Sequence, residues 1–458
     1  MCLRPSFPLS MRFSELEGAR IGVWGAGREI RSFSAQLARR LPGTAIAVVA
    51  SDSPLDAEAR AAVKSPGARF ISGPDLDRAL AACDIVVRSP GVSIYRSEVI
   101  GLKRRGVVVT TATALWLHEH GGRRVIGITG TKGKSTTAAL TAHLARAVGL
   151  TANLAGNIGV PALDLLDAPE ADVSVLELSS YQIADLEAGP EIAVVTNLYR
   201  EHTDWHGSED VYRADKLRLL ALPGVRVAVV NGRDETMRAA AEAAPSTALY
   251  GVPNGWDVAE DGIRLRGELR LPRAELPLLG THNALNVCAA LTALELLGAS
   301  VPARDGLFAG FEPLAHRLEI VLDAEGVTWI DDSISTTPES TLAAIESLGE
   351  RRFVLIAGGH DRGQDYTALG HVLARREAVV VALPVTGDRV IRAARAAGVP
   401  DECALAAEGL EHALDLARPL LAPGMAVLLS PAAPSYGAYR DFIERGEHFR
   451  ALIGAGAA

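Results

Sequence analysis

The chain has 458 residues, enough for two to four domains, and carries a formal charge of −9. No basic patch dominates the sequence, which argues against a nucleic-acid partner. The four cysteines share no short spacing, so neither a zinc site nor a disulfide framework is indicated, and a cytoplasmic location is expected. The first residues lack a secretory signal, and no apolar run reaches about 18 residues, so no membrane partner is expected.

Residues 1–117 are predicted to form an α/β domain with a parallel sheet. Its β-rich runs, separated by helical segments, read RIGVW, TAIAVVASD, CDIVVRSPGV and GVVVTTAT. The turn GAGREI after the first run breaks the dinucleotide-binding pattern, because Ile30 stands where the third glycine belongs. Gly25 and Gly27 would still let a pyrophosphate approach the backbone, but a turn without any ligand fits equally well.

Residues 118–313 are predicted to form a second α/β domain, with strands in RRVIGITG, VSVLELSS, IAVVTNL and VRVAVVNG. Residues 314–458 are predicted to form a third, with strands in VTWIDDS, FVLIAGG, AVVVAL and MAVLLSP. The loops after three of these last strands would share one sheet edge and form a small-molecule pocket. The fold class is therefore α/β, with three such domains in series.

The stretch IGITGTKGKSTT, residues 126–137, is typical of a phosphate-binding loop. A strand leads into glycines and a helix follows at once, so backbone N–H groups and the helix N-terminus can face phosphate oxygens. Lys134 would neutralise the β- and γ-phosphates, and Ser135 could ligate Mg²⁺. Gly130 stands only three residues before Gly133, so the loop is shorter than the common form.

Further charged or ionisable residues could also bind phosphate or Mg²⁺. Glu177 ends a strand, where a carboxylate can hold Mg²⁺ beside a triphosphate, although a solvent-facing acid is the alternative. His202 follows a strand and is either a ligand or a satisfied loop histidine. Arg317 could reach a γ-phosphate or be a surface arginine. Lys216, taken alone, is expected on a solvated helix face.

These motifs, in this order, resemble the Mur ligase family over essentially the whole chain. The family's glycine-lysine loop, its GN-x-G turn and its ELSS segment are here residues 129–136, 156–159 and 177–180. The family's HN-x-x-N helix start and HR-x-E linker are also present, at residues 282–286 and 316–319. The SPGV and LLSPAAPSYGAYRDF segments most resemble the subgroup that adds glutamate to UDP-N-acetylmuramoyl-L-alanine.

The resemblance implies a monomeric, ATP-dependent amide ligase of peptidoglycan precursor synthesis. The first domain would be Rossmann-like and bind the UDP-sugar, the second would be of the P-loop ATPase type and bind ATP, and the third would be Rossmann-like and bind glutamate. ATP would convert the terminal alanine carboxylate to an acyl phosphate, which the amine of the amino acid then attacks. Such catalysis depends mainly on positioning and on cations that stabilise the developing negative charge.

The resemblance also implies site residues, two Mg²⁺ ions and carbamylation of Lys216. The implied catalytic residues are Lys134, His202, Lys216 and Arg317. The implied ATP-binding residues are Gly130, Thr131, Lys132, Gly133, Lys134, Ser135, Thr136, Asn283, Asn286, Arg317 and Asp332. The implied metal ligands are Ser135, Glu177 and His202. The implied substrate-binding residues are Gly25, Gly27, Asn157, Thr336, Arg362, Ser435 and Phe442, of which the last three match the glutamate pocket.

The chain departs from the family pattern in its third domain. The usual N-D-S-K-A-T-N motif reads DDSISTT, so Ile334 replaces a lysine, and Glu201 stands where aspartate is usual. These changes favour the family branch that adds L-glutamate, with D-glutamate as the alternative. A folylpolyglutamate-synthase-like ligase, a nicotinamide-dependent oxidoreductase and a non-catalytic nucleotide-binding regulator are the competing hypotheses.

Overall fold

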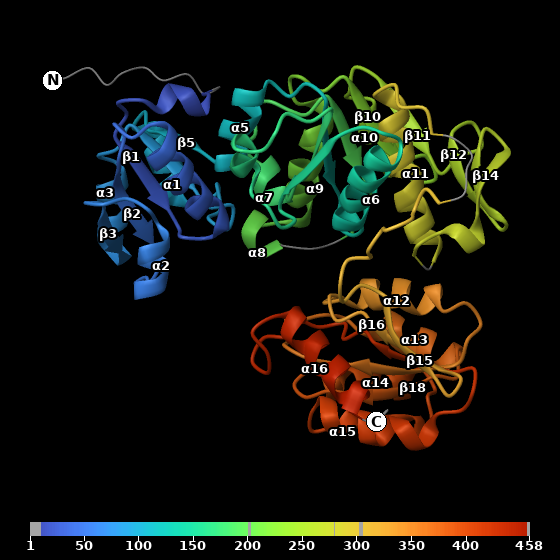
Figure 1. Ribbon diagram of the computed structural model, residues 1–458. Helices are drawn as coiled ribbons and strands as arrows, with labels where there is room; N and C mark the ends of the chain where they lie inside the picture. Colours follow the sequence, from blue (N-terminus) through green and yellow to red (C-terminus); the bar gives the residue numbers. More distant parts are fainter. Residues whose placement is uncertain (1–10, 200–202, 279, 302–305, 456–458) are drawn as a thin grey trace. The chain divides into compact units, whose positions relative to one another are not determined.

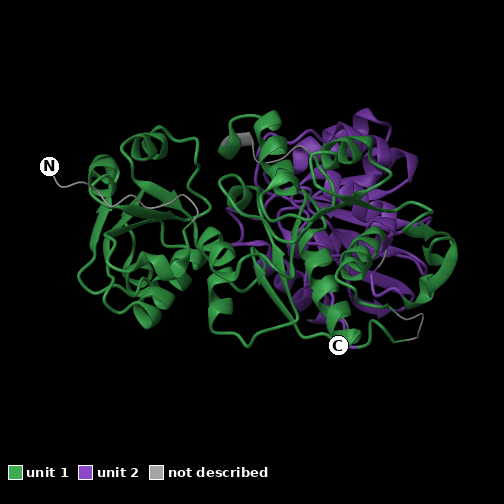
Figure 2. Cartoon of the chain, turned by 90° about the horizontal axis from the view of Figure 1, so that it is seen from above, with its two compact units in different colours: residues 1–275, 285–309 green, residues 276–284, 310–458 purple. Residues whose placement is uncertain are grey.

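The computed structural model describes residues 11–199, 203–278, 280–301 and 306–455 (Figure 1). Its contacts divide the chain into two compact units, residues 1–275 with 285–309, and residues 276–284 with 310–458 (Figure 2). We call them the first and second units. No helix in the described ranges is long and apolar enough to cross a membrane.

The first unit begins with a parallel sheet in the order β3-β2-β1-β4-β5. Its strands are β1 Ile21–Trp24, β2 Ile46–Ser51, β3 Arg69–Ser72, β4 Ile85–Arg88 and β5 Val108–Thr110. Its helices are α1 Arg28–Arg40, α2 Ala57–Ala62, α3 Leu76–Leu80, α4 Ser97–Arg104 and α5 Ala112–His120. The predicted parallel sheet is confirmed. The edge strand β3 was not predicted because its sequence RFIS lacks an apolar run.

A second parallel sheet in the first unit has the order β11-β10-β9-β6-β8-β7. Its strands are β6 Val125–Thr129, β7 Ala152–Gly156, β8 Val173–Glu177, β9 Ile192–Val195, β10 Val227–Asn231 and β11 Thr247–Tyr250. The accompanying helices are α6 Lys134–Ala147, α7 Ser180–Ile183, α8 Thr203–His206, α9 Glu209–Leu217, α10 Glu235–Ala241 and α11 Thr281–Leu296. An antiparallel sheet, which the sequence did not predict, contains β12 Trp256–Ala259, β13 Gly262–Leu265 and β14 Glu268–Pro272.

The order of this second sheet creates a binding edge beside β6. From β6 the chain passes to β7 and β8 on one side, and then crosses to β9 and β10 on the other. In open α/β sheets, ligands bind at such a switch point, at the carboxyl ends of the strands. β6 is buried throughout because its apolar residues pack on both faces of the sheet.

The second unit contains a sheet in the order β15-β16-β20-β17-β18-β19, in which β15 is antiparallel to β16. Its strands are β15 Glu319–Ala324, β16 Val327–Asp331, β17 Phe353–Ala357, β18 Val379–Ala382, β19 Ala404–Ala406 and β20 Ala426–Leu429. Its helices are α12 Pro338–Ser347, α13 Thr367–Arg375, α14 Gly387–Ala396, α15 Leu410–Ala417 and α16 Phe442–Ala455. Alternate strand residues pack against α12–α14 on one face and α15–α16 on the other, so the sheet is covered on both sides.

Within the first unit, a buried ion pair joins the first parallel sheet to the second. Arg88, at the end of β4, is fully buried, and its Nε and Nη2 lie 3.0 Å and 2.6 Å from the two carboxylate oxygens of Asp185. Helix α5 continues through the predicted boundary between residues 117 and 118. The bounds 1–117, 118–313 and 314–458 stay a prediction.

Asp185→Ala is expected to destabilise the first unit by about 3–5 kcal/mol, because Arg88 would keep a buried charge without its carboxylate partner. Urea unfolding followed by tryptophan fluorescence would measure the change, since the Trp205 ring lies 5.8 Å from the Arg88 guanidinium. A loss below about 1 kcal/mol would mean that the pair behaves like an exposed one.

Candidate active site

The loop between β6 and α6 has a backbone that requires glycine. Gly130 has φ +148° and Gly133 has φ +79°, both in the region that side chains disfavour. A Cβ on Gly130 would lie 1.9 Å from Thr196 Oγ1, and one on Gly133 would lie 2.6 Å from Asn286 Oδ1. The predicted strand, glycine turn and helix are confirmed, and close packing leaves no space for a side chain at either glycine.

Residues that follow β9 brace this loop. The Lys132 N–H donates to Asn197 Oδ1 at 2.8 Å, and Thr196 Oγ1 donates to the Lys132 carbonyl at 2.6 Å. The Thr131 N–H donates to the Asn197 carbonyl at 2.9 Å. The sequence analysis missed Thr196 and Asn197. They lie at the carboxyl end of the predicted strand IAVVTNL, and that position was the signal that could have found them.

The start of α6 presents a cation and hydroxyls beside the loop. Lys134 Nζ donates to the Thr131 carbonyl at 2.9 Å, so its charge is held over the turn. Ser135 is partly exposed, whereas Thr136 Oγ1 is buried and has no hydrogen-bond partner among the described residues. A helix N-terminus with these groups is suited to binding a polyphosphate.

Glu177 lies at the same edge because β8 pairs in parallel with β6, with Glu177 opposite Ile128. Its carboxylate is 1% exposed, and Oε1 accepts a 2.9 Å hydrogen bond from Asn157 Nδ2. Oε2 is buried without a partner in the described part of the chain. An ionised oxygen in this situation fits a cation, and Mg²⁺ prefers carboxylate and hydroxyl oxygens.

Lys216 is brought to the loop by α9. It is 2% exposed, and its Nζ donates to the Gly130 carbonyl at 2.8 Å and lies 5.1 Å from the centre of the Tyr212 ring. The solvated position expected of a lone lysine is therefore wrong, because packing against the loop outweighs the usual preference for water. His202 lies outside the described residues.

The turn after β1 lies against the GN-x-G turn. Gly25 has φ +102°, and Gly27 is the N-cap of α1. The next residue, Arg28, donates from Nη2 to the Asn157 carbonyl at 3.3 Å and from Nη1 to the Gly159 carbonyl at 3.1 Å. The structure thus brings together the three residues predicted to bind the nucleotide-sugar. It adds Arg28, which lies in the GAGREI turn but was given no role in the sequence analysis.

Helix α11 carries the two asparagines predicted to contact ATP. Asn286 is 7% exposed, and its side chain lies beside Gly133, so close that a Cβ on that glycine would clash with it. Asn283 is 4% exposed at the start of the helix.

In the second unit, Asp332 is buried at the end of β16. Its Oδ1 accepts from the Leu318 N–H at 3.2 Å and its Oδ2 from Ser430 Oγ at 2.7 Å. Burial raises the pKa of Asp332 to about 6, against the opposing effect of these hydrogen bonds and the positive charge of Arg317. The charges of Arg317 and Asp332 therefore interact, as expected if both residues contact the same nucleotide.

Loops after three adjacent strands meet at one edge of the second unit's sheet, as predicted. The His360 N–H donates to the Pro434 carbonyl at 2.8 Å, and the Arg362 guanidinium lies 5.5 Å from the Tyr436 ring centre. Ser333 Oγ donates to the Phe442 carbonyl at 2.8 Å. Two further predicted residues lie on these loops, Thr336 partly exposed and Ser435 buried.

Arg445 joins two of these loops and was missed by the sequence analysis. It is 1% exposed and donates to the carbonyls of Ser333 and Ala433 at 2.7 Å and 3.2 Å. Burial lowers the pKa of Arg445 to about 10, which still leaves it a cation at neutral pH. A buried positive charge thus lies next to the segment in which Ile334 replaces the expected lysine.

Comparison with known proteins assigns the family. Residues 128–294 match the Mur ligase middle domain, and residues 316–433 match the domain described as "Mur ligase, glutamate ligase domain". A relative from Micromonospora sp., named UDP-N-acetylmuramoyl-L-alanine–L-glutamate ligase, is 44% identical over 455 residues, covering 97% of this chain and 98% of the relative. The chain belongs to the Mur ligase family.

Other known proteins agree with this chain in sequence or in fold. A relative of the same name from Xanthomonas euvesicatoria is 40% identical over 461 residues, with 97% of each chain covered. The MurF ligase of Thermotoga maritima, solved with ADP, has a TM-score of 0.59 at 15% identity and covers 98% of this chain and 99% of its own. A folylpolyglutamate synthase from Mycobacterium tuberculosis has a TM-score of 0.56 at 18% identity, covering 74% of this chain and 93% of its own. At such identities the likeness shows only the fold, the three-domain α/β architecture of Mur ligases.

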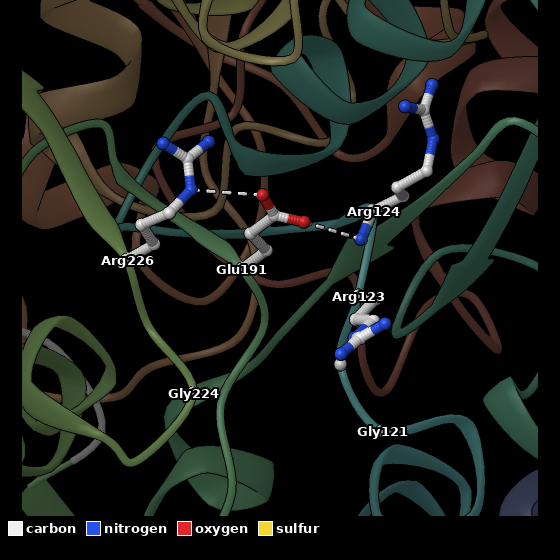
Figure 3. A pocket seen from close by; sticks show the side chains of 7 residues that line it. Gly121, Arg123, Arg124, Glu191, Gly224 and Arg226 are labelled. Atoms are coloured by element: carbon white, nitrogen blue, oxygen red, sulfur yellow. Dashed lines mark hydrogen bonds and ion pairs between the residues drawn. The ribbon is translucent and has the colours of Figure 1, made fainter.

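A pocket of about 380 Å³ lies at the opposite edge of the central Mur ligase sheet (Figure 3). Arg124, Glu191 and Arg226 line it and immediately precede β6, β9 and β10, whereas the phosphate loop follows β6. Glu191 accepts from the Arg124 N–H at 2.7 Å and from Arg226 Nε at 3.0 Å, so part of the pocket's charge is neutralised internally. The candidate active site lies at the other edge of this sheet, where the phosphate loop follows β6.

The buried carboxylate of Asp332 should make this Mur ligase less stable as the pH rises. The pKa of Asp332 is raised from 3.8 to about 6, so the folded state retains the proton between these values, and stability is lost as the pH rises through that window. Asp332→Asn should therefore be more stable than the wild type by about 2–3 kcal/mol at pH 7.5, and equally stable near pH 4.

Urea unfolding of both proteins from pH 4 to 8 would measure this difference. The asparagine can keep the Leu318 hydrogen bond, while Ser430 Oγ can still donate to Thr341 Oγ1, 2.9 Å away. A difference in stability that does not change with pH would contradict the raised pKa.

Proposed function

We propose that this chain is an ATP-dependent ligase that adds L-glutamate to UDP-N-acetylmuramoyl-L-alanine, a step of peptidoglycan precursor synthesis. The observation that best supports the proposal is the arrangement of residues where the neighbouring parallel strands β6 and β8 end. Lys134 and the glycine loop lie there beside Glu177, whose buried Oε2 has no partner among the described residues. The names of the relatives at 40–44% identity supply the substrates.

The reaction would proceed in two steps. A carboxylate oxygen of the terminal alanine attacks the γ-phosphorus of ATP, the bond to the bridging oxygen breaks, and ADP leaves. The amine of glutamate then attacks the acyl carbon and loses a proton, and the tetrahedral intermediate expels inorganic phosphate. Both steps build negative charge on oxygens, so fixed cations and donors can lower both barriers.

In the first unit, we assign each residue a role according to its position. The loop N–H groups and Lys134 would hold the β- and γ-phosphates, while Asn286 would lie on the adenine side. Mg²⁺, when bound at Ser135 and Glu177, would neutralise phosphate charge, with a second ion and His202 completing the set. Asn157 would contact the UDP-sugar. Lys216 would be carbamylated, which converts the buried cation into an anion able to support a metal.

The residues of the second unit would serve ATP and glutamate. Arg317 would contact the γ-phosphate and Asp332 the ribose. Arg362, Ser435 and Phe442 would form the glutamate pocket, in which a guanidinium can hold a carboxylate through two hydrogen bonds. The family membership argues against a nicotinamide-dependent oxidoreductase, and the substrate named for the relatives argues against folate. We further propose a cytoplasmic monomer with domains at 1–117, 118–313 and 314–458.

The purified chain tests this directly. With ATP, Mg²⁺, UDP-N-acetylmuramoyl-L-alanine and L-glutamate, phosphate should be released in equal amount to a product whose mass equals both substrates less one water. Omission of any single component should stop phosphate release. Release that persists without the nucleotide-sugar, or that requires a folate instead, would contradict the proposed function.

A further inference from the structure

A chain of hydrogen bonds in the first unit leads from the first sheet to the helix that carries Lys216. Tyr95, in the loop between β4 and α4, donates its hydroxyl to Asp215 on α9, with 2.8 Å and 2.9 Å to the two carboxylate oxygens. Asp215 Oδ2 lies 2.6 Å from His206 Nδ1, and His206 Nε2 lies 3.0 Å from Ser180 Oγ. We call Tyr95, Asp215, His206 and Ser180 the relay.

The order serine, histidine, aspartate matches that of a hydrolytic triad, but the burial does not. Ser180 and His206 are each 2% exposed and Asp215 is 7% exposed, so no substrate can reach the serine oxygen. A triad serine must face a cleft, because it attacks its substrate directly. The relay must therefore act on the protein itself.

Two members of the relay, Asp215 and Ser180, lie next to residues of the candidate active site. Asp215 directly precedes Lys216, whose Nζ is held on the Gly130 carbonyl, so fixing Asp215 fixes the rotation of α9 about its axis. Ser180 begins α7, three residues after Glu177. Buried charge-assisted hydrogen bonds are short and directional, so they are suited to fixing such positions.

The Tyr95 end of the relay lies in the loop between β4 and α4, within the domain that the family resemblance assigns to the nucleotide-sugar. Trp205, next to His206, donates from Nε1 to the carbonyls of Pro90 and Gly91 at 3.1 Å and 3.2 Å. Ser93 Oγ donates to the Trp205 carbonyl at 2.8 Å. The loop between β4 and α4 is thereby tied to both α8 and α9, and Tyr95 itself remains 42% exposed.

We propose that Tyr95, Asp215 and His206 are positioning residues, which align Lys216 on the phosphate loop and make that alignment depend on the β4–α4 loop. The proposal rests on the proposed role of Lys216. It requires no titration of the relay. The hydroxyl of Tyr95 is the only atom that Tyr95→Phe removes, which makes it the cleanest point at which to break the relay.

Tyr95→Phe should lower kcat about 10-fold, with KM for ATP and L-glutamate changed less than about 2-fold, because Lys216 is misplaced while the binding residues stay. The matched control is Ser32→Ala. Ser32 Oγ also donates to a carboxylate across the same sheet-to-sheet interface, that of Asp164 at 2.6 Å, but this bond does not involve α9. Ser32→Ala should leave kcat unchanged.

Two further measurements decide between a relay and simple interface packing. In the relay, Tyr95→Phe should have no further effect on kcat once Asp215→Ala is present, whereas independent contacts give additive losses. Amide hydrogen exchange of residues 209–217 should accelerate in Tyr95→Phe and not in Ser32→Ala.

Equal kcat losses in Tyr95→Phe and Ser32→Ala, additive losses in the double variant, or unchanged exchange in α9 would each overturn the relay. The exchange measurement does not depend on whether the protein catalyses the proposed reaction. Accelerated exchange of α9 in Tyr95→Phe, found alongside a wild type that releases no phosphate, would contradict the proposed function and still support the relay.

Discussion

Lys134→Ala should reduce kcat for ATP-dependent phosphate release by about 10³-fold, because it removes the fixed cation from the point where charge develops on the transferred phosphoryl group. Lys134 Nζ is already held by the Thr131 carbonyl, so its position requires no reorganisation during the reaction. Steady-state phosphate release with all substrates saturating would measure the loss.

The matched control is Lys103→Ala, which removes an exposed lysine from the last turn of α4 and should leave kcat unchanged. Both variants should melt within about 4 °C of the wild type, since alanine is a good helix former. A Lys134→Ala enzyme that retains a tenth or more of the wild-type kcat would contradict the assignment of the loop to ATP.

Glu177→Gln should lower kcat by about 10²- to 10³-fold and raise the Mg²⁺ concentration needed for half-maximal activity. Among the described residues, only Oε1 of Glu177 has a partner, Asn157 Nδ2, and an amide oxygen can keep that hydrogen bond. The substitution therefore removes the charge offered to the metal and preserves the packing. Titration of activity with MgCl₂ would measure both effects.

Glu191→Gln provides the control at the other edge of the same sheet. Glu191 accepts from Arg226 and from the Arg124 N–H, away from the phosphate loop, so its loss should leave the Mg²⁺ dependence unchanged. If Glu177→Gln and the wild type showed the same Mg²⁺ dependence, Glu177 would be only a structural partner of Asn157.

The sequence could predict those parts of the site that depend on local order. A buried strand, glycines and a helix start are neighbours in the chain, so the β6–α6 loop followed from spacing alone. Glu177 could be placed at a strand end for the same reason. The small sheet β12–β14 was not predicted from the sequence because its short strands are only partly buried, and their apolar pattern is weak.

The parts that sequence reasoning missed depend on contacts between distant residues. Taken alone, Lys216 was expected in water, and only the family resemblance pointed to it, because nothing within α9 shows that the helix packs on Gly130, 86 positions away. Tyr95 and Asp215 are separated by 120 positions, and Ser333 and Arg445 by 112. Nothing in the sequence links the two members of either pair, so only the folded chain reveals these contacts.

The most direct test of the central claim is ATP-dependent phosphate release with UDP-N-acetylmuramoyl-L-alanine and either enantiomer of glutamate. Ile334 stands where the family resemblance expects a lysine, and the buried Arg445 donates to the carbonyl of the neighbouring Ser333. The relatives at 40–44% identity are named for L-glutamate. Phosphate release and product with L-glutamate, and none with D-glutamate, is the result we predict. Release with D-glutamate and none with L-glutamate would contradict it.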